Sequence, residues 1–251
     1  MRFSHFTVSA GLVAGVMSSP LDIRASKPPY FLLTGDSTVA INGGWGDGFN
    51  DFLKDPAKGE NHGKSGATTV SFRAQGLWDA VISATNEHAA EYEPIVTIQF
   101  GHNDQKAAAN ISVEQFQANL ETMAKEVQAA GGTPILITSL TRRTFSGGAV
   151  IQNLEEQRVR AIAAAEAVGA KYLDLNEAST TYVNAIGQGN ADSYNLSDGD
   201  RTHLNTLGER LFGRMVVDLL LRKRKGLKRF FEPAGLLSKK IWAGEFATGD
   251  E

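Results

Sequence analysis

Residues 95–104 read IVTIQFGHND. Six residues that are mostly apolar and favour strands pass directly into a glycine and three polar side chains. Such a run is typical of a strand buried in a parallel sheet, with polar residues just past its carboxyl end. Three other short runs share this character, namely Tyr30–Leu33, Pro134–Leu140 and Tyr172–Leu175. With Ile95–Phe100 they predict four buried strands.

Helical periodicity occupies the segments between these strands. The segments expected to be helical are 77–90, 113–127, 151–168 and 207–219. The second begins with the pattern of a capping box, formed by Ser112 and Gln115. Strands that alternate with helices predict an α/β fold with a parallel sheet covered on both faces, a three-layer α/β/α sandwich of the flavodoxin-like kind. The site of such a sheet lies at the carboxyl ends of its strands.

The chain has 251 residues, of which 42% are hydrophobic and 21% charged. This composition suits one globular α/β domain and excludes disorder as a description of the whole chain. The chain has no Cys, which excludes a disulfide framework, a Cys nucleophile and a thiolate metal site. The formal net charge of −3 gives no reason to expect a nucleic-acid partner.

The amino-terminal segment 1–25 has the layout of a secretory signal peptide. A positively charged start precedes a short apolar run with small residues, and this run is too short to span a bilayer. We therefore expect a secreted protein without a transmembrane segment. Two sequons, at Asn110 and Asn195, fit export, although the triplets leave open whether either carries a glycan.

The carboxy-terminal segment 223–251 differs in composition from the body. Residues 222–251 hold eight Lys and Arg but four Asp and Glu. This pattern favours a solvated basic extension. The alternative is attachment to an anionic polymer or surface.

Polar residues that suit acyl transfer follow the expected strands. Ser37 comes just after the first strand, and Asn103 just after the second. Asp200 and His203 stand three residues apart, directly before the last helix. Each taken alone also fits an ordinary turn or a structural pair. Together, a serine, an imidazole and a carboxylate are the groups of nucleophilic acyl transfer. A metal hydrolase using Asp104 with Asp200 and His203 is an alternative.

The order of these residues resembles the SGNH (GDSL-type) hydrolase superfamily, over about residues 31–221. Further motifs look like the rhamnogalacturonan acetylesterases of carbohydrate esterase family 12, which are secreted and remove acetyl groups from pectin. These motifs are GDSTV at 35–39, GGWG at 43–46, Ser71-Phe72 with Gly76 and Trp78, FGHND at 100–104, and TRR at 141–143. The resemblance implies an SGNH hydrolase domain over residues 26–222.

The resemblance also implies roles for individual residues. Ser37 would be the nucleophile, His203 its base and Asp200 the carboxylate that orients the imidazole. The oxyanion hole would be the backbone N–H groups of Ser37 and Gly66 with the side chain of Asn103. No cofactor and no metal are implied.

Some assignments in the segment just before Ser71-Phe72 are open. Gly63 is a rival to Gly66. The resemblance favours Gly66, because it lies six residues before Phe72, which is the spacing in the corresponding block of the family. Where many family members have Arg after this glycine and again before Ser-Phe, this chain has Ala67 and Val70.

Candidate substrate contacts are the aromatic side chains of Trp45 and Trp78 and the cationic ones of Arg142 and Arg143. For the tryptophans a core role is the alternative, and for the arginines a structural ion pair. The expected partner is an acetylated polysaccharide, bound by a monomer. Three other activities remain open: deacetylation of another glycan, lipase- or thioesterase-like hydrolysis, and glycan binding without catalysis.

Overall fold

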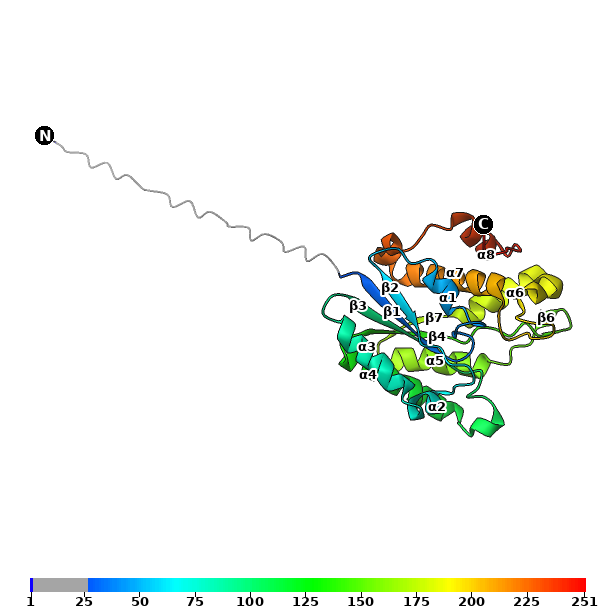
Figure 1. Ribbon diagram of the computed structural model, residues 1–251, viewed down its shortest axis with the longest axis horizontal. Coiled ribbons are helices and arrows are strands. Elements are labelled where there is room, and N and C mark those ends of the chain that lie inside the picture. Colours follow the sequence, from blue (N-terminus) through cyan, green and yellow to red (C-terminus); the bar gives the residue numbers. More distant parts are fainter. Residues whose placement is uncertain (2–26) are drawn as a thin grey trace.

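The computed structural model describes residue 1 and residues 27–251. Its centre is a sheet of five parallel strands in the order β2-β1-β3-β4-β7, which matches the SGNH hydrolase fold (Figure 1). The strands are β1 (Pro29–Gly35), β2 (Lys58–Asn61), β3 (Glu93–Gln99), β4 (Thr133–Ile137) and β7 (Lys171–Leu173). The four predicted strands are therefore confirmed. The additional strand β2 reads Lys-Gly-Glu-Asn and lies at the sheet edge, so it has no apolar run to reveal it.

Helices cover both faces of the sheet (Figure 1). One face carries α1 (Gly46–Asn50), α6 (Leu175–Ala191), α7 (Thr206–Lys223) and α8 (Gly235–Ala243). The other carries α2 (Thr69–Ala74), α3 (Leu77–His88), α4 (Val113–Ala129) and α5 (Glu155–Ala167). Three 3₁₀ turns, at Ala107–Ala109, Asp192–Tyr194 and Lys225–Phe230, and a hairpin of β5 (Phe145–Ser146) and β6 (Ala149–Val150) complete the described fold.

Successive side chains of the strands enter two separate cores. In β1, Phe31 and Leu33 pack under the α7 face, whereas Leu32 packs under the α4 face. β4 repeats this alternation with Ile135, Leu136 and Ile137. Strands with both faces buried explain why the sequence shows continuous apolar runs rather than alternation.

The helix boundaries depend on capping side chains. Ser112 accepts a hydrogen bond from the backbone N–H of Gln115, but the side chain of Gln115 pairs with Asn119, so only half of the predicted capping box forms. Asp174 ends the last predicted strand early by capping α6, which the sequence pattern did not predict. Asn205 caps α7 by accepting a hydrogen bond from Gly208.

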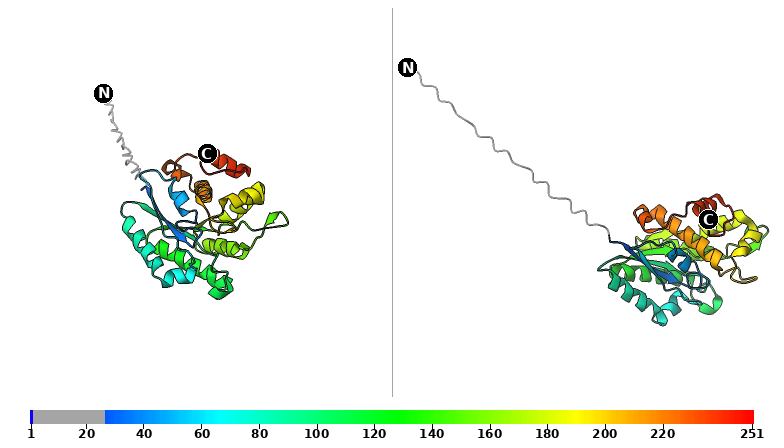
Figure 2. Two further views of the ribbon diagram at one scale, coloured as in Figure 1. Left: turned by 45° about the vertical axis from the view of Figure 1, so that its right-hand side comes forward. Right: turned by 45° about the horizontal axis from the view of Figure 1, so that its top comes forward.

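The carboxy-terminal segment 224–251 is folded onto the body. Leu227, Phe230, Phe231, Leu237 and Ile241 are buried in the core on the α7 face. The expectation of a solvated extension is wrong here, because these apolar side chains outweigh the exposed charges between them. Both turned views show α8 lying against α7 (Figure 2).

The expected signal peptide lies outside the described residues, apart from Met1. Among the residues that the structure describes, no helix has the length and apolar character needed to cross a bilayer.

Candidate active site

Ser37, His203 and Asp200 form a continuous hydrogen-bonded chain. Ser37 follows β1, and the other two lie in the loop that leads into α7. The Oγ of Ser37 lies 2.9 Å from Nε2 of His203. The Nδ1 of His203 lies 2.8 Å from Oδ2 of Asp200. The structure thus brings together three residues that are up to 166 positions apart in the sequence.

Asp200 is held as an anion by the turn that it closes. Its Oδ1 accepts hydrogen bonds from the backbone N–H groups of Thr202 and His203, each at 3.0 Å. Burial opposes the charge, but these two bonds and the imidazole of His203 outweigh it and lower the pKa of the carboxyl. An ionised carboxylate at this position fixes the ring of His203 and leaves Nε2 facing the serine.

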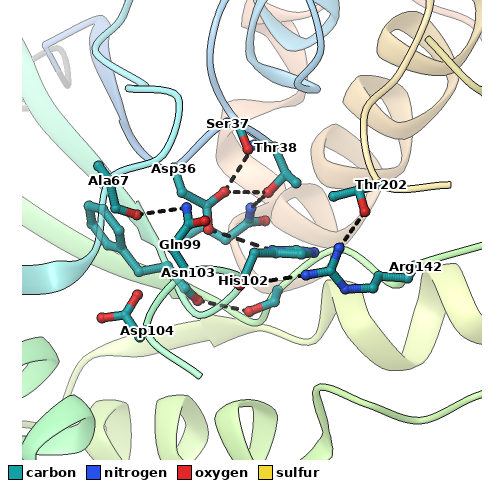
Figure 3. A network of polar contacts seen from close by, with 12 residues as sticks. Asp36, Ser37, Thr38, Ala67, Gln99, His102, Asn103, Asp104, Arg142 and Thr202 are labelled. Carbon is teal, nitrogen blue, oxygen red and sulfur yellow. Dashed lines mark hydrogen bonds and ion pairs between the residues drawn. The ribbon is translucent and has the colours of Figure 1, made fainter. Parts of the chain in front are cut away.

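A chain of buried side chains fixes the turn that carries Ser37. Trp45 donates through Nε1 to Gln99, which donates to the hydroxyl of Thr38, which donates to Asp36. Figure 3 shows Gln99, Thr38 and Asp36 directly beneath the serine. Trp45 is fully buried, so it supports the turn that carries Ser37. The prediction that Trp45 stacks on a sugar is wrong, and its alternative core role is the one observed.

Asp36 and His102 form a second buried pair beside the triad. Nδ1 of His102 lies 3.5 Å from Oδ2 of Asp36, and both side chains are almost fully buried. Burial disfavours the charge of Asp36, yet His102 and the N–H and hydroxyl of Thr38 together lower its pKa. The sequence motifs contain both residues, but no spacing in the sequence indicated that they would meet.

Two hydrogen bonds fix the side-chain amide of Asn103, which follows β3. Its Nδ2 donates to the carbonyl of Ala67 at 3.0 Å, and its Oδ1 accepts from Lys106 at 2.7 Å. The amide orientation is therefore fixed, and one N–H of Nδ2 remains available. The contact to Ala67 also brings the loop that contains Gly66 beside Asn103 (Figure 3).

The backbone hydrogen bonds and packing distinguish Gly66 from Gly63, the two glycines considered for the oxyanion hole. Gly66 is exposed, has φ +78°, and its N–H donates to no acceptor within residues 27–251. The N–H of Gly63 already donates to Oδ1 of Asn61, and a Cβ at Gly63 would meet the backbone of Ala40 at 2.4 Å. Gly63 is thus needed for packing, whereas Gly66 has a free donor.

Asp104 joins the two loops that carry these donors. Its Oδ1 accepts from both the backbone N–H and the hydroxyl of Thr69, at 2.8 and 2.6 Å. Thr69 is the first residue of α2, just after the Gly66 loop. Burial raises the pKa of Asp104 in spite of these bonds, and the charge of Asp36 adds to this effect.

Arg143 is a structural residue of the triad loop. It is fully buried, and its guanidinium donates to Oδ1 of Asn195 and to the backbone carbonyls of Asp200 and His203. Burial lowers its pKa to about 10. A direct contact from Arg143 to a substrate is therefore excluded, because no part of its side chain reaches the surface.

Arg142 bridges the FGHND motif and the loop that carries His203. Its guanidinium donates to the hydroxyl of Thr202 and, at 3.5 Å, to the carbonyl of His102 (Figure 3). It is half-buried, so its contact with a substrate stays a prediction. Sequence reasoning missed Thr202, whose position next to His203 was the available signal.

Three further predictions can be compared with the structure. Trp78 is buried, with Nε1 donating to Glu126, so it also does not stack on a sugar. Among the described residues, Asp104 does not join Asp200 and His203 in a group that could hold a metal ion. Asn110 is exposed, whereas Asn195 is engaged by Arg143, so the two sequons have different surroundings.

Comparison with known proteins agrees with this geometry. Residues 33–211 match the model of the GDSL-like Lipase/Acylhydrolase family. The chain belongs to this family. As a GDSL-like acylhydrolase it is a carboxylic ester hydrolase, and its SGNH fold follows from the same match.

Relatives of this acylhydrolase include a curated bacterial enzyme. The chain is 29% identical over 212 residues to the rhamnogalacturonan acetylesterase RhgT of Bacillus subtilis (strain 168), a match that covers 76% of this chain and 89% of the relative.

Solved structures share the fold. The protein YXIM of Bacillus subtilis has a TM-score of 0.68 at 25% identity, and the match covers 81% of this chain but 58% of that one. The acetylxylan esterase Axe2 of Geobacillus stearothermophilus has a TM-score of 0.54 at 15% identity, covering 78% and 94% of the two chains.

Proposed function

We propose that this acylhydrolase removes O-acetyl groups from a pectic polysaccharide, rhamnogalacturonan, through an acetyl-enzyme on Ser37. The observation that carries the mechanism is the chain from Ser37 through His203 to Asp200 at the carboxyl ends of the strands. The likeness to RhgT supports the choice of substrate. The proposal includes export to the medium and action as a monomer, as the sequence predicts.

In the first step the Oγ of Ser37 attacks the acetyl carbonyl carbon. His203 accepts the serine proton at Nε2 as the new C–O bond forms, because Nδ1 carries its proton toward Asp200. Asp200 stays ionised and stabilises the resulting imidazolium.

The developing oxyanion needs fixed donors. The N–H groups of Ser37 and Gly66 make no hydrogen bond within the described chain, and one N–H of Asn103 is free. Three preorganised donors around one oxygen stabilise the tetrahedral intermediate, and loss of one donor typically costs about 10²–10³ in rate.

Collapse of the intermediate breaks the bond to the sugar oxygen. His203 returns its proton to that oxygen, and the deacetylated polysaccharide leaves. Water then attacks the acetyl-enzyme by the same sequence, with His203 as base, and releases acetate and free Ser37.

The test is acetate release from acetylated rhamnogalacturonan by the wild type and by Ser37→Ala, with Ser146→Ala as a control. Ser146 is an exposed serine in β5 and takes no part in the hydrogen bonds that join Ser37, His203 and Asp200. We expect Ser37→Ala to lose at least about 10⁴-fold in rate and Ser146→Ala to keep full activity.

Other outcomes would contradict parts of the proposal. Serine-dependent release that is faster from acetylated xylan would keep the mechanism and overturn the pectin assignment. A preference for long-chain acyl esters over acetyl esters would instead place the protein with lipid-acting enzymes.

A further inference from the structure

We infer that the folded carboxy-terminal segment forms a second binding surface for the acidic backbone of a polysaccharide, away from the catalytic serine. The surface is a groove of about 510 Å³ between α7, the turn after it and α8. We call it the basic groove, because Arg222, Lys225 and Lys228 line it together with Trp242. The inference rests on the proposed function only in its choice of a uronate-containing glycan as the occupant.

In the part of the chain that the structure describes, the cations of the basic groove have no acidic partners. Arg222, Lys225 and Lys228 are exposed, and none makes an ion pair within residues 27–251. Asp218 is the one acidic residue among those described as lining the groove, and it is paired with Arg214 at 2.9 Å. Three uncompensated charges at one hollow create a positive potential that attracts an anion.

Trp242 adds an apolar surface to these charges. Its indole Nε1 donates to Oδ2 of Asp218, and the guanidinium of Arg222 lies 3.5 Å from its ring centre. These contacts fix the ring, and Trp242 as a residue remains 37% exposed. A fixed aromatic ring beside cations suits a uronic acid, whose ring has apolar faces and whose carboxylate pairs with ammonium or guanidinium groups.

The charge distribution favours this surface over the rest of the molecule. The whole chain is net negative, whereas residues 222–251 hold twice as many basic as acidic residues. An acidic polymer is therefore repelled by the body on average and attracted at the basic groove. This is the alternative of a polymer-binding tail, now carried by a folded surface.

The distance to the triad indicates how such binding would act. Asn205 caps α7 two residues after His203, and Arg222 lies near the other end of this helix. The helix rise places the groove about 25 Å from the triad. A polymer held there keeps further acetyl groups near Ser37 through effective concentration, without any contact to the reacting ester.

Binding is tested first, without catalysis. The probe is polygalacturonate in a native gel, with neutral galactan as the uncharged comparison. We expect the wild type to be retarded by polygalacturonate alone, and high salt to abolish the retardation because it screens surface charges. The variant R222Q/K225Q/K228Q should lose the retardation.

A matched variant controls for net charge. K125Q/K171Q/K239Q removes the same charge at exposed lysines outside the groove and should still be retarded. Equal retardation of the two triple variants, or equal retardation by galactan, would overturn the inference. So would groove-dependent binding to phosphatidylserine vesicles without binding to polygalacturonate, because the surface would then serve a lipid.

Kinetics separate this inference from the proposed function. On 4-nitrophenyl acetate the groove variant should match the wild type, which also shows that it folds. On acetylated rhamnogalacturonan its KM should rise about tenfold with kcat unchanged. If the wild type does not deacetylate this polymer but the groove still binds polygalacturonate, the proposed function fails and the inference stands. An unchanged KM on a polymer that the wild type does deacetylate would overturn the inference.

Discussion

At the residue scale, two of the three proposed donors of the oxyanion hole, those of Asn103 and Gly66, come from two loops that must stay in register. Asn103 follows β3, and Gly66 precedes α2. The loops are joined by the bond from Asn103 to Ala67 and by the two bonds that Asp104 accepts from Thr69. Asp104 touches no reacting atom, so it is a positioning residue.

We therefore expect Asp104→Ala to lower kcat on a small acetyl ester by about 10- to 100-fold with little change in KM, because a displacement of about 1 Å can cost 10²-fold. Asp104→Asn keeps the Oδ1 acceptor and should restore most of the activity. Steady-state kinetics of both variants check this. Full kcat in Asp104→Ala would show that the loops hold their positions without this carboxyl.

At the element scale, the last helix and the residues after it are held by the side chain of Glu251. Its Oε1 accepts from Lys240 and from the N–H of Thr248, and its Oε2 accepts from the N–H of Gly249. Burial opposes the charge, but these hydrogen bonds lower the pKa of Glu251 from 4.5 to about 2. A carboxyl whose pKa is lower in the folded state than in the unfolded state stabilises the fold at pH values above its ordinary pKa. This stabilisation is lost as the pH falls toward the folded-state pKa.

Glu251→Gln should therefore lower the Tm at neutral pH, since an amide group cannot accept all three bonds. The difference in Tm from the wild type should shrink as the pH falls from 4.5 to about 2, where the wild-type carboxyl also becomes protonated. Thermal unfolding across this pH range checks the sign. Glu245→Gln, at an exposed side chain of the same segment, is the control and should show no such trend.

At the scale of the whole molecule, the basic segment completes the core on the α7 face. Phe231 packs its ring 5.7 Å from that of Phe31 in β1 and 5.5 Å from that of Phe49 in α1. The residues on either side of Phe231 form backbone hydrogen bonds with the segment after α1. The N–H of Lys54 donates to the carbonyl of Phe230, and the N–H of Glu232 donates to the carbonyl of Phe52. The segment is thus part of the domain that carries the triad.

Phe231→Ala should lower the free energy of unfolding by about 3–5 kcal/mol, the usual cost of removing a buried phenyl group. Leu236→Ala removes an exposed side chain of the same segment and should change it by less than about 0.5 kcal/mol. Urea unfolding of both variants measures the difference. Equally small effects would mean that the segment is dispensable for the stability of the domain.

The sequence by itself determined the elements with strong periodicity, and it predicted the serine, histidine and aspartate that the structure joins by hydrogen bonds. Buried parallel strands require continuous apolar runs, so β1, β3, β4 and β7 could be recognised, and the polar residues that follow β1 and β3 mark the active-site edge. The polar edge strand β2 and the helix α6 escaped prediction, because pairing to β1 and capping by Asp174 form them rather than local pattern.

Only the tertiary structure decided how the other side chains are used. Burial is a property of the packed molecule, so the sequence could not show that Trp45, Trp78 and Arg143 are enclosed rather than facing a substrate. The same holds for the bonds of Asp104 to Thr69 and for the basic groove. Each depends on residues far apart in the chain, which meet only when the sheet and its covering helices are assembled.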